Sequence, residues 1–133
     1  MIITPDNITA LKSNEVFTYG SNTAGRHGKG AAKTALKWGA RMGVGEGHEG
    51  QTYALSTKDA KLNVLSLREI QINVDRYLRY ATAHPELTFL TTAIGTGLAR
   101  LAVKDIAPMF KGAPANVALP KSFWDVLNPT KIP

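Results

Sequence analysis

Residues 16–41 limit the fold of this chain most, because a strand, a glycine-rich loop and a small-residue helix follow one another directly. Residues 16–19, Val-Phe-Thr-Tyr, are β-branched or aromatic and predict a strand. Four glycines follow between residues 20 and 30, and the alanines from residue 31 onward predict a helix. Such a turn presents backbone N–H groups to a phosphate. The alternative is a loop that needs glycine only to change direction.

The rest of the chain alternates between strand and helix patterns. The expected elements are strands at 1–4, 51–57, 87–94 and 116–119, and helices at 66–83 and 103–110. Ser66 and Glu69 have capping-box spacing, which predicts a helix start. Residues 43–50 read as a flexible stretch, and residues 128–133 as a loose end. The alternation predicts an α/β fold, a mixed sheet flanked by helices, in one domain over residues 1–133.

Composition excludes several classes of protein. The chain has no cysteine, so disulfides, thiolate metal sites and a cysteine nucleophile are absent. It has no apolar run of about 20 residues and no signal-peptide pattern, so we expect no membrane partner and a cytoplasmic location. The net charge of +6 suits phosphate-bearing ligands. The cations are spread from Lys12 to Lys131 without a block and without interleaved aromatics, so we do not expect a nucleic-acid partner.

Three predicted strands end in polar or glycine-rich residues: Gly20–Asn22, Lys58–Asp59 and Gly95–Gly97. Ligands of open α/β sheets bind where loops leave the carboxyl ends of the strands. If the three strands are parallel neighbours, their ends converge on one cleft.

Known nucleotide motifs match only partly. The spacing from Gly20 to Gly25 is that of a P-loop, but Arg26 and His27 stand where that loop needs Lys and Ser or Thr, which excludes an ATPase. Residues 45–50, Gly-Glu-Gly-His-Glu-Gly, match the dinucleotide fingerprint but precede a strand, whereas the fingerprint must follow one. The three histidines have no metal-ligand spacing, so we expect no metal, and no cofactor is indicated.

The loop before the helix has the context and the charge for a diphosphate. Asn22 ends the strand and either caps the turn or holds a ribose hydroxyl or a water molecule. Asp59 is the candidate base, with a solvated turn as its alternative. The candidate catalytic residues are therefore Asn22 and Asp59. The candidate ligand-binding residues are Asp6, Gly20, Ser21, Asn22, Gly25, Arg26, His27, Gly28, Lys29, Gly30, Ala31, Ile94, Gly95, Thr96, Gly97 and Leu98.

The order of these motifs resembles macro domains, the ADP-ribose-binding modules, and in particular small bacterial and phage-type macro-like proteins. Residues 6–11 are similar to the Gly-Asp-Ile-Thr-x-Leu that opens macro domains, with Pro5 in place of the Gly. Residues 16–22 are similar to the strand that ends in Asn-Ala-Ala-Asn, and residues 25–32 to the first diphosphate loop. Residues 90–98 are similar to the strand and second loop that end in Ser-Thr-Gly-Ile-Tyr-Gly.

The resemblance implies a three-layer macro-like fold and an ADP-ribose-like nucleotide ligand, with Asp6 at the adenine amino group. Three functions follow as hypotheses: binding with hydrolysis of an ADP-ribosyl bond, binding alone to sequester a nucleotide signal, and, ranked last, a basic nucleic-acid module. Neither the oligomeric state nor the exact ligand follows from the sequence.

Overall fold

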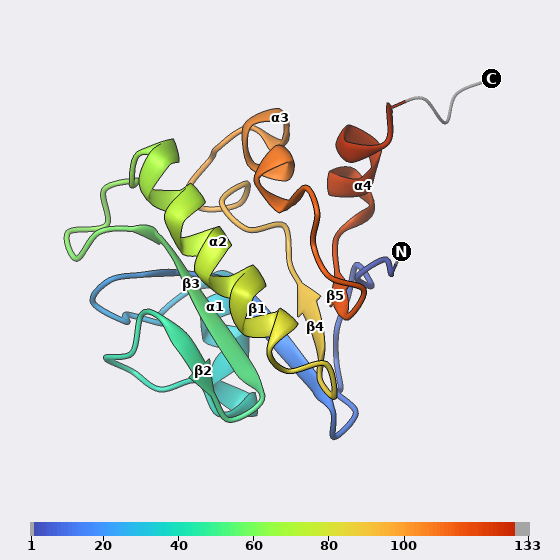
Figure 1. The fold of residues 1–133 in the computed structure, drawn as a ribbon. Coiled ribbons are helices and arrows are strands. Elements are labelled where there is room, and N and C mark those ends of the chain that lie inside the picture. The colour runs from blue at the N-terminus through green and yellow to red at the C-terminus, as the bar shows by residue number, and fades with distance from the viewer. Residues whose placement is uncertain (1, 130–133) are drawn as a thin grey trace.

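Five strands form one sheet in the order β2-β3-β1-β4-β5 in the computed structural model, which describes residues 2–129 (Figure 1). The strands are β1 Glu15–Asn22, β2 Gly47–Glu49, β3 Thr52–Lys58, β4 Thr88–Thr91 and β5 Val117–Ala118. β1 pairs in parallel with β3 and with β4, β4 pairs in parallel with β5, and β2 pairs antiparallel with β3. The predicted α/β class with a mixed sheet is confirmed, and the structure shows that the sheet is mostly parallel.

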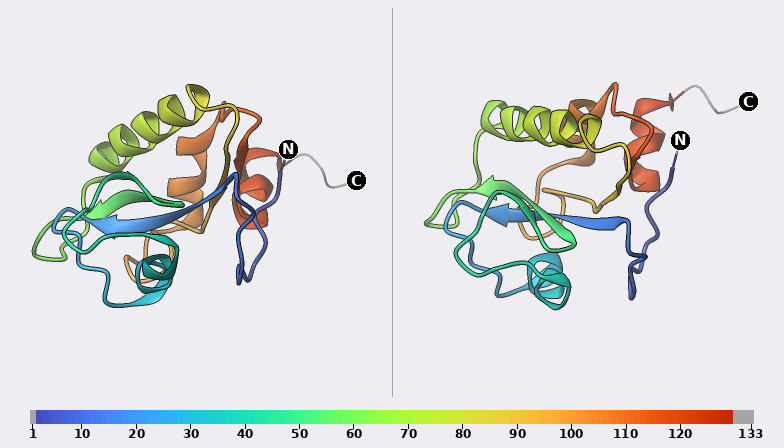
Figure 2. Two further views of the ribbon diagram at one scale, coloured as in Figure 1. Left: turned by 90° about the horizontal axis from the view of Figure 1, so that it is seen from below. Right: turned by 60° about the horizontal axis from the view of Figure 1, so that its bottom comes forward.

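Helices cover both faces of this sheet (Figure 2). The helices are α1 Gly30–Ala35, α2 Leu67–Thr82, α3 Val103–Ile106 and α4 Lys121–Leu127. A 3-10 helix follows α1 at Leu36–Trp38, and another follows α3 at Ala107–Phe110. α1 lies on one face and α2 on the other (Figure 2). No helix among residues 2–129 combines the length and the apolar character that a membrane crossing needs.

Two clusters of buried side chains hold the layers together. One, under α2, α3 and α4, includes Val16, Ile70 and Phe123, and the other, under α1, includes Phe17 and Ala35. Because successive side chains of a strand point to opposite faces, neighbouring residues of β1 enter different clusters. β1 is therefore shared by both layers, and so is β3, which contributes Tyr53 to one cluster and Ala54 to the other.

The longest helix follows its sequence pattern. Ser66 Oγ accepts a hydrogen bond from the Glu69 N–H at 3.1 Å, and Glu69 Oε1 accepts one from the Ser66 N–H at 3.1 Å, so the predicted capping box is present. The predicted apolar face is buried at Ile70, Val74 and Tyr77. This helix was predictable because its cap and its periodicity are both local in sequence.

Other elements differ from their predicted extents. Residues 43–50 are not wholly a flexible stretch, because Gly47–Glu49 form β2 and turn at Gly50, whose φ is +58°, into β3. β4 ends at Thr91, although the Thr92 N–H still donates to the Thr18 carbonyl of β1 at 3.0 Å. The predicted first strand is reduced to one parallel bridge between Ile3 and Leu119, and its Met1 lies outside the described residues. Of the predicted loose end, residues 130–133 also lie outside the described residues.

Candidate functional site

The carboxyl ends of β3, β1 and β4 lie side by side, because these strands are parallel neighbours in the sheet. Three loops leave this edge: residues 23–29 after β1, residues 59–66 after β3 and residues 92–102 after β4. The parallel arrangement on which the expected convergence depended is therefore present. We refer to residues 20–30 as the first loop and to residues 94–98 as the second loop.

Asn22 stabilises the first loop through hydrogen bonds to its backbone. Its Oδ1 accepts a hydrogen bond from the Arg26 N–H at 3.0 Å, and its Nδ2 donates to the Arg26 carbonyl at 2.9 Å. Its own carbonyl accepts from the Gly25 N–H at 2.9 Å. The side chain is buried, so both ends of its amide close the turn that starts the loop. Of the two sequence interpretations, this geometry matches the capping role.

His27 and Gly25 face the interior of the protein. Nε2 of His27 lies 2.9 Å from the Arg41 carbonyl and 3.1 Å from the Val44 carbonyl, so this nitrogen carries the proton that it donates. The His27 side chain is only 1% exposed, and its Nδ1 has no hydrogen-bond partner among residues 2–129. A methyl group on Gly25 would lie 2.3 Å from the Val44 nitrogen, so this position requires glycine. Both residues attach the first loop to residues 41–44.

The outer part of the first loop is open. Arg26, Gly28, Lys29 and Gly30 are exposed. A methyl group on Gly28 would meet no atom within 4 Å. Within residues 2–129, no protein atom accepts a hydrogen bond from the N–H groups of Gly28, Lys29 or Gly30. These N–H groups are free to donate to an anion, and Lys29, between the two glycines, is extended, with φ −146° and ψ 158°.

The second loop folds tightly on itself. The Leu101 N–H donates to the Gly95 carbonyl at 2.7 Å, and Oγ1 of Thr96 donates to the Ala93 carbonyl at 2.7 Å. Gly95 has a φ of +79°, which favours glycine. Ile94 is buried in the cluster under α2, whereas Gly97 and Leu98 are exposed.

The two loops lie side by side. A methyl group on Gly30 would lie 3.5 Å from Cδ1 of Leu98, and one on Gly20 would lie 3.7 Å from the Gly95 nitrogen. The first and second loops therefore form adjoining walls at the carboxyl edge of β1 and β4. Ser21 lies behind them, buried, with its hydroxyl 3.3 Å from the Asn22 carbonyl.

A pocket of about 270 Å³ lies beside the start of α1. Its lining combines the amino-terminal segment, α1 and the end of β4: Thr4, Pro5, Asp6, Asn7, Ile8, Phe17, Ala31, Thr34, Thr92, Ala93 and Pro120. Of the predicted ligand residues, Asp6 and Ala31 line it. The volume is close to the lower end for small-molecule sites.

Asp59 is held in a turn at the end of β3. Its Oδ1 accepts hydrogen bonds from the Lys61 N–H at 2.8 Å and from the Asn63 N–H at 2.9 Å. The bond from Asn63 contributes most to lowering the pKa of Asp59 below its ordinary value of 3.8. A carboxylate with a lowered pKa is a weak base, so these contacts match the turn interpretation more closely than the catalytic one.

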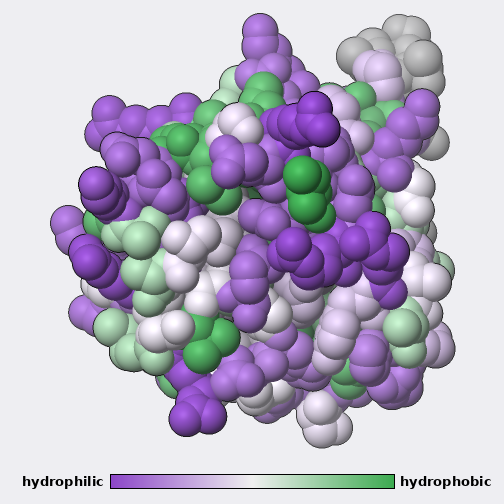
Figure 3. All heavy atoms as spheres, turned by 60° about the vertical axis from the view of Figure 1, so that its left-hand side comes forward, coloured by the Kyte–Doolittle hydropathy of each residue, from purple (hydrophilic) through white to green (hydrophobic). Residues whose placement is uncertain are grey.

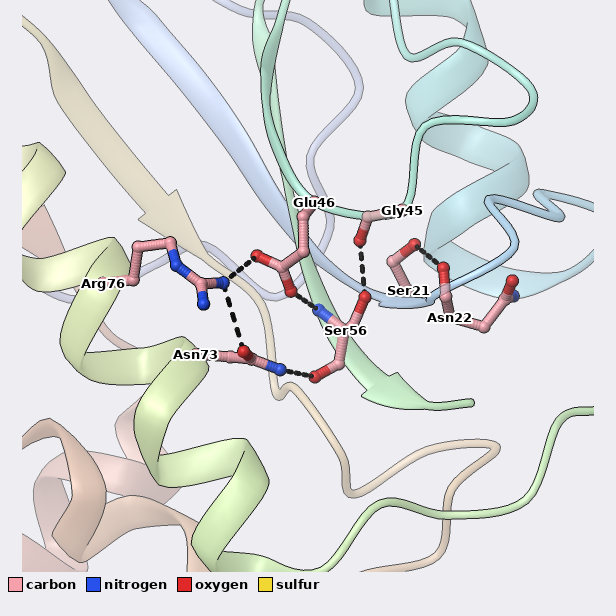
Figure 4. Close-up of polar contacts among 7 residues, drawn as sticks. All are labelled: Ser21, Asn22, Gly45, Glu46, Ser56, Asn73 and Arg76. Carbon is pink, nitrogen blue, oxygen red and sulfur yellow. Dashed lines mark hydrogen bonds and ion pairs between the residues drawn. The ribbon is translucent and has the colours of Figure 1, made fainter. Parts of the chain in front are cut away.

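A polar network that sequence reasoning did not find lies next to Asn22 (Figure 4). Glu46 Oε1 accepts a hydrogen bond from the Ser56 N–H at 2.6 Å, and its Oε2 pairs with Arg76 at 3.2 Å. Asn73 donates to the Ser56 carbonyl at 3.0 Å, so the network joins α2 to the part of β3 that lies beyond its pairing with β2. Partial burial raises the pKa of Glu46 above its ordinary value of 4.5. Its partners are 10 and 30 residues away in sequence, and no local pattern could have identified them.

Comparison with known proteins supports the fold but assigns no family. No protein-family model and no curated protein matches the chain. The chain is similar to a solved structure of a Bacteroides thetaiotaomicron protein of unknown function. The TM-score is 0.58 at 15% sequence identity, and the alignment covers 90% of this chain and 96% of that one. At this identity the likeness concerns the fold alone.

Proposed function

We propose that this protein binds ADP-ribose or a related NAD-derived nucleotide, with the diphosphate held between the first and second loops. The closeness of the two loops carries the proposal, because it places two glycine-rich walls together at the carboxyl ends of parallel strands. The macro-like order of the motifs supports the choice of nucleotide. The finer classification as a three-layer macro-like fold belongs to this same proposal, and helices on both sheet faces support it.

Each part of the site has a role in this proposal. The free N–H groups of Gly28, Lys29 and Gly30 donate to the diphosphate oxygens, and the exposed side chains of Arg26 and Lys29 offset their charge. The adenosine half of the ligand enters the pocket beside Ala31, where Asp6 is within reach of the base. Asn22, Gly25 and His27 act indirectly, because they hold the loop in shape.

Binding without turnover is the form of this function that the contacts favour. The Arg26 backbone binds both ends of the Asn22 amide. The Asp59 carboxylate accepts hydrogen bonds from two backbone N–H groups, and its pKa is lowered. Neither candidate catalytic residue is arranged to take a proton from water. A protein of this kind sequesters a nucleotide signal made from NAD.

Calorimetric titration with ADP-ribose tests the proposal. We expect saturable heat for the protein, and at least an about tenfold weaker dissociation constant for Gly28→Glu. Gly28 has open space around it and does not have a left-handed φ, so the added side chain fits the fold. Its carboxylate lies where the diphosphate is proposed to bind and repels it.

Ala115→Glu is the matched control. It adds the same charge at an exposed position before β5, at the amino ends of the parallel strands and away from the two loops. It is expected to bind ADP-ribose like the unmodified protein. Absence of heat at about millimolar ADP-ribose would contradict the proposal, as would equal weakening in the two variants.

A further inference from the structure

The carboxyl edge of the sheet gathers positive charge that the sequence spreads out. The segments that end or follow β1, β3 and β4 (residues 23–30, 58–66 and 92–102) carry five cations and one carboxylate, Asp59. The cations are Arg26, Lys29, Lys58, Lys61 and Arg100, and we call this set the basic edge. The segments at the amino ends of the same strands (11–15, 49–51 and 83–87) carry one cation and three carboxylates. The sheet therefore has one positive edge.

The cations of the basic edge are available to a partner. Arg26, Lys29, Lys61 and Arg100 are exposed, and Lys58 is half-buried. Within residues 2–129, the ion pairs are Arg41–Glu49, Arg76–Glu46 and Lys121–Asp125, and none of them includes the basic edge. Figure 3 shows the side of the molecule to the left in Figure 1, where apolar residues form separate patches within a hydrophilic surface.

Backbone strain is concentrated in two of the same loops. Among the described residues, Leu62 and Arg100 are the non-glycine residues with positive φ, at 66° and 58°. A left-handed conformation costs a residue with a side chain about 1 kcal/mol or more, and such residues cluster at functional sites. The Arg100 N–H donates to the Gly97 carbonyl at 2.9 Å, which fixes this cation beside the second loop.

We propose that the partner at this edge is a nucleic acid strand whose backbone phosphates contact the basic edge while one of its nucleotides reaches the first and second loops. This proposal rests on the nucleotide site proposed above and names the polymer that presents the nucleotide. A diphosphate alone needs fewer cations than the five that three loops supply. Residues 23–30, 58–66 and 92–102 contain no Phe, Trp or Tyr, which argued from the sequence against a base-stacking site. The proposed contact is therefore with phosphates and is independent of base sequence.

Fluorescence anisotropy with a labelled single-stranded oligonucleotide tests the proposal. We expect binding at low salt, with a slope of log K against log salt of about −3.5 if all five cations contact phosphates. Lys61→Glu is expected to weaken binding about tenfold and to reduce the slope by roughly 0.7. Lys61 lies outside the two loops, so this variant is expected to keep its heat with ADP-ribose.

The matched control is Lys111→Glu. It reverses an exposed charge before β5, at the amino ends of the parallel strands. It is expected to bind the oligonucleotide like the unmodified protein, and free ADP-ribose is expected to displace the strand. Absence of oligonucleotide binding would overturn the inference, as would equal weakening by the two variants. The inference would also be overturned if polyglutamate, an anionic polymer without nucleotides, displaced the oligonucleotide as well as ADP-ribose does, or if ADP-ribose did not displace it. The nucleotide site is judged separately, by the heat of ADP-ribose binding.

Discussion

Single residues of the first loop divide into those that hold its shape and those that face solvent. Asn22 and His27 direct their polar atoms at backbone groups of Arg26, Arg41 and Val44. Gly28 and Lys29 lie on the outside. Residue type alone does not separate these groups, because an asparagine or a histidine suits a ligand and a backbone turn equally well. Burial separates them.

The pKa of Glu46 leads to a pH-dependent prediction. Partial burial raises this pKa above 4.5, so the folded protein binds the proton more tightly than the unfolded chain does. The tighter binding of this proton stabilises the fold fully below the pKa that Glu46 has in the unfolded chain. The stabilisation is lost as the pH rises through the pKa that Glu46 has in the folded protein. We therefore expect Glu46→Gln to gain stability relative to the unmodified protein as the pH rises above the ordinary pKa of 4.5, measured by urea unfolding.

For Asp59→Asn we expect the opposite change of stability with pH. Hydrogen bonds from Asn63 and Lys61 lower the pKa of Asp59 from 3.8, so its carboxylate stabilises the fold above that pH and loses the effect as the pH falls. Asp59→Asn should therefore be less stable than the unmodified protein at about pH 7 and converge with it in acid. If both variants change in the same direction with pH, the assigned environments are wrong.

At the scale of elements, the structure depends on local signals in some places and on partners in others. α2 has its own cap and its own apolar face, so it was predictable from residues 66–83. β2 has three residues and exists because β3 provides its hydrogen bonds. Its side chains carry no period long enough to recognise, which is why the sequence suggested a flexible stretch.

The cap of α2 leads to a prediction for one element. Ser66→Ala removes the oxygen that accepts the Glu69 N–H, so we expect the free energy of unfolding to fall by about 1 kcal/mol. Ser122→Ala is the control, because Ser122 is exposed and its hydroxyl makes no hydrogen bond within residues 2–129. We expect the control to change stability by less than about 0.5 kcal/mol. Equal stabilities in chemical denaturation would show that the cap contributes nothing.

At the scale of the whole molecule, one sheet separates two packed layers and collects charge at one edge. Val16 and Phe17 are neighbours on β1 but belong to different clusters, so each cluster depends on the same strand. The cations of the basic edge lie up to 74 residues apart in sequence (Arg26 and Arg100), and they meet because the topology places β3 and β4 on either side of β1.

The shared strand predicts that both layers unfold together. Trp38 packs against Phe17 in the cluster under α1, with ring centroids 5.0 Å apart, and Trp124 packs against the cluster under α2, α3 and α4. Trp124→Phe therefore leaves a fluorescent probe of one layer, and Trp38→Phe leaves a probe of the other. Within each variant we expect the urea midpoints from fluorescence and from circular dichroism to coincide. Separate midpoints would mean that the two layers are independent units.

The sequence by itself determined the α/β class, the strand and loop of residues 16–30 and the start of α2 at Ser66, because these depend on residues within a few positions of one another. It also indicated which loops carry glycine. Only the tertiary structure decided that Asn22, Gly25 and His27 face inward, that Glu46 pairs with Arg76, and that five scattered cations share one edge. Strand order and side-chain burial are set by contacts between residues far apart in the chain, and no local pattern encodes them.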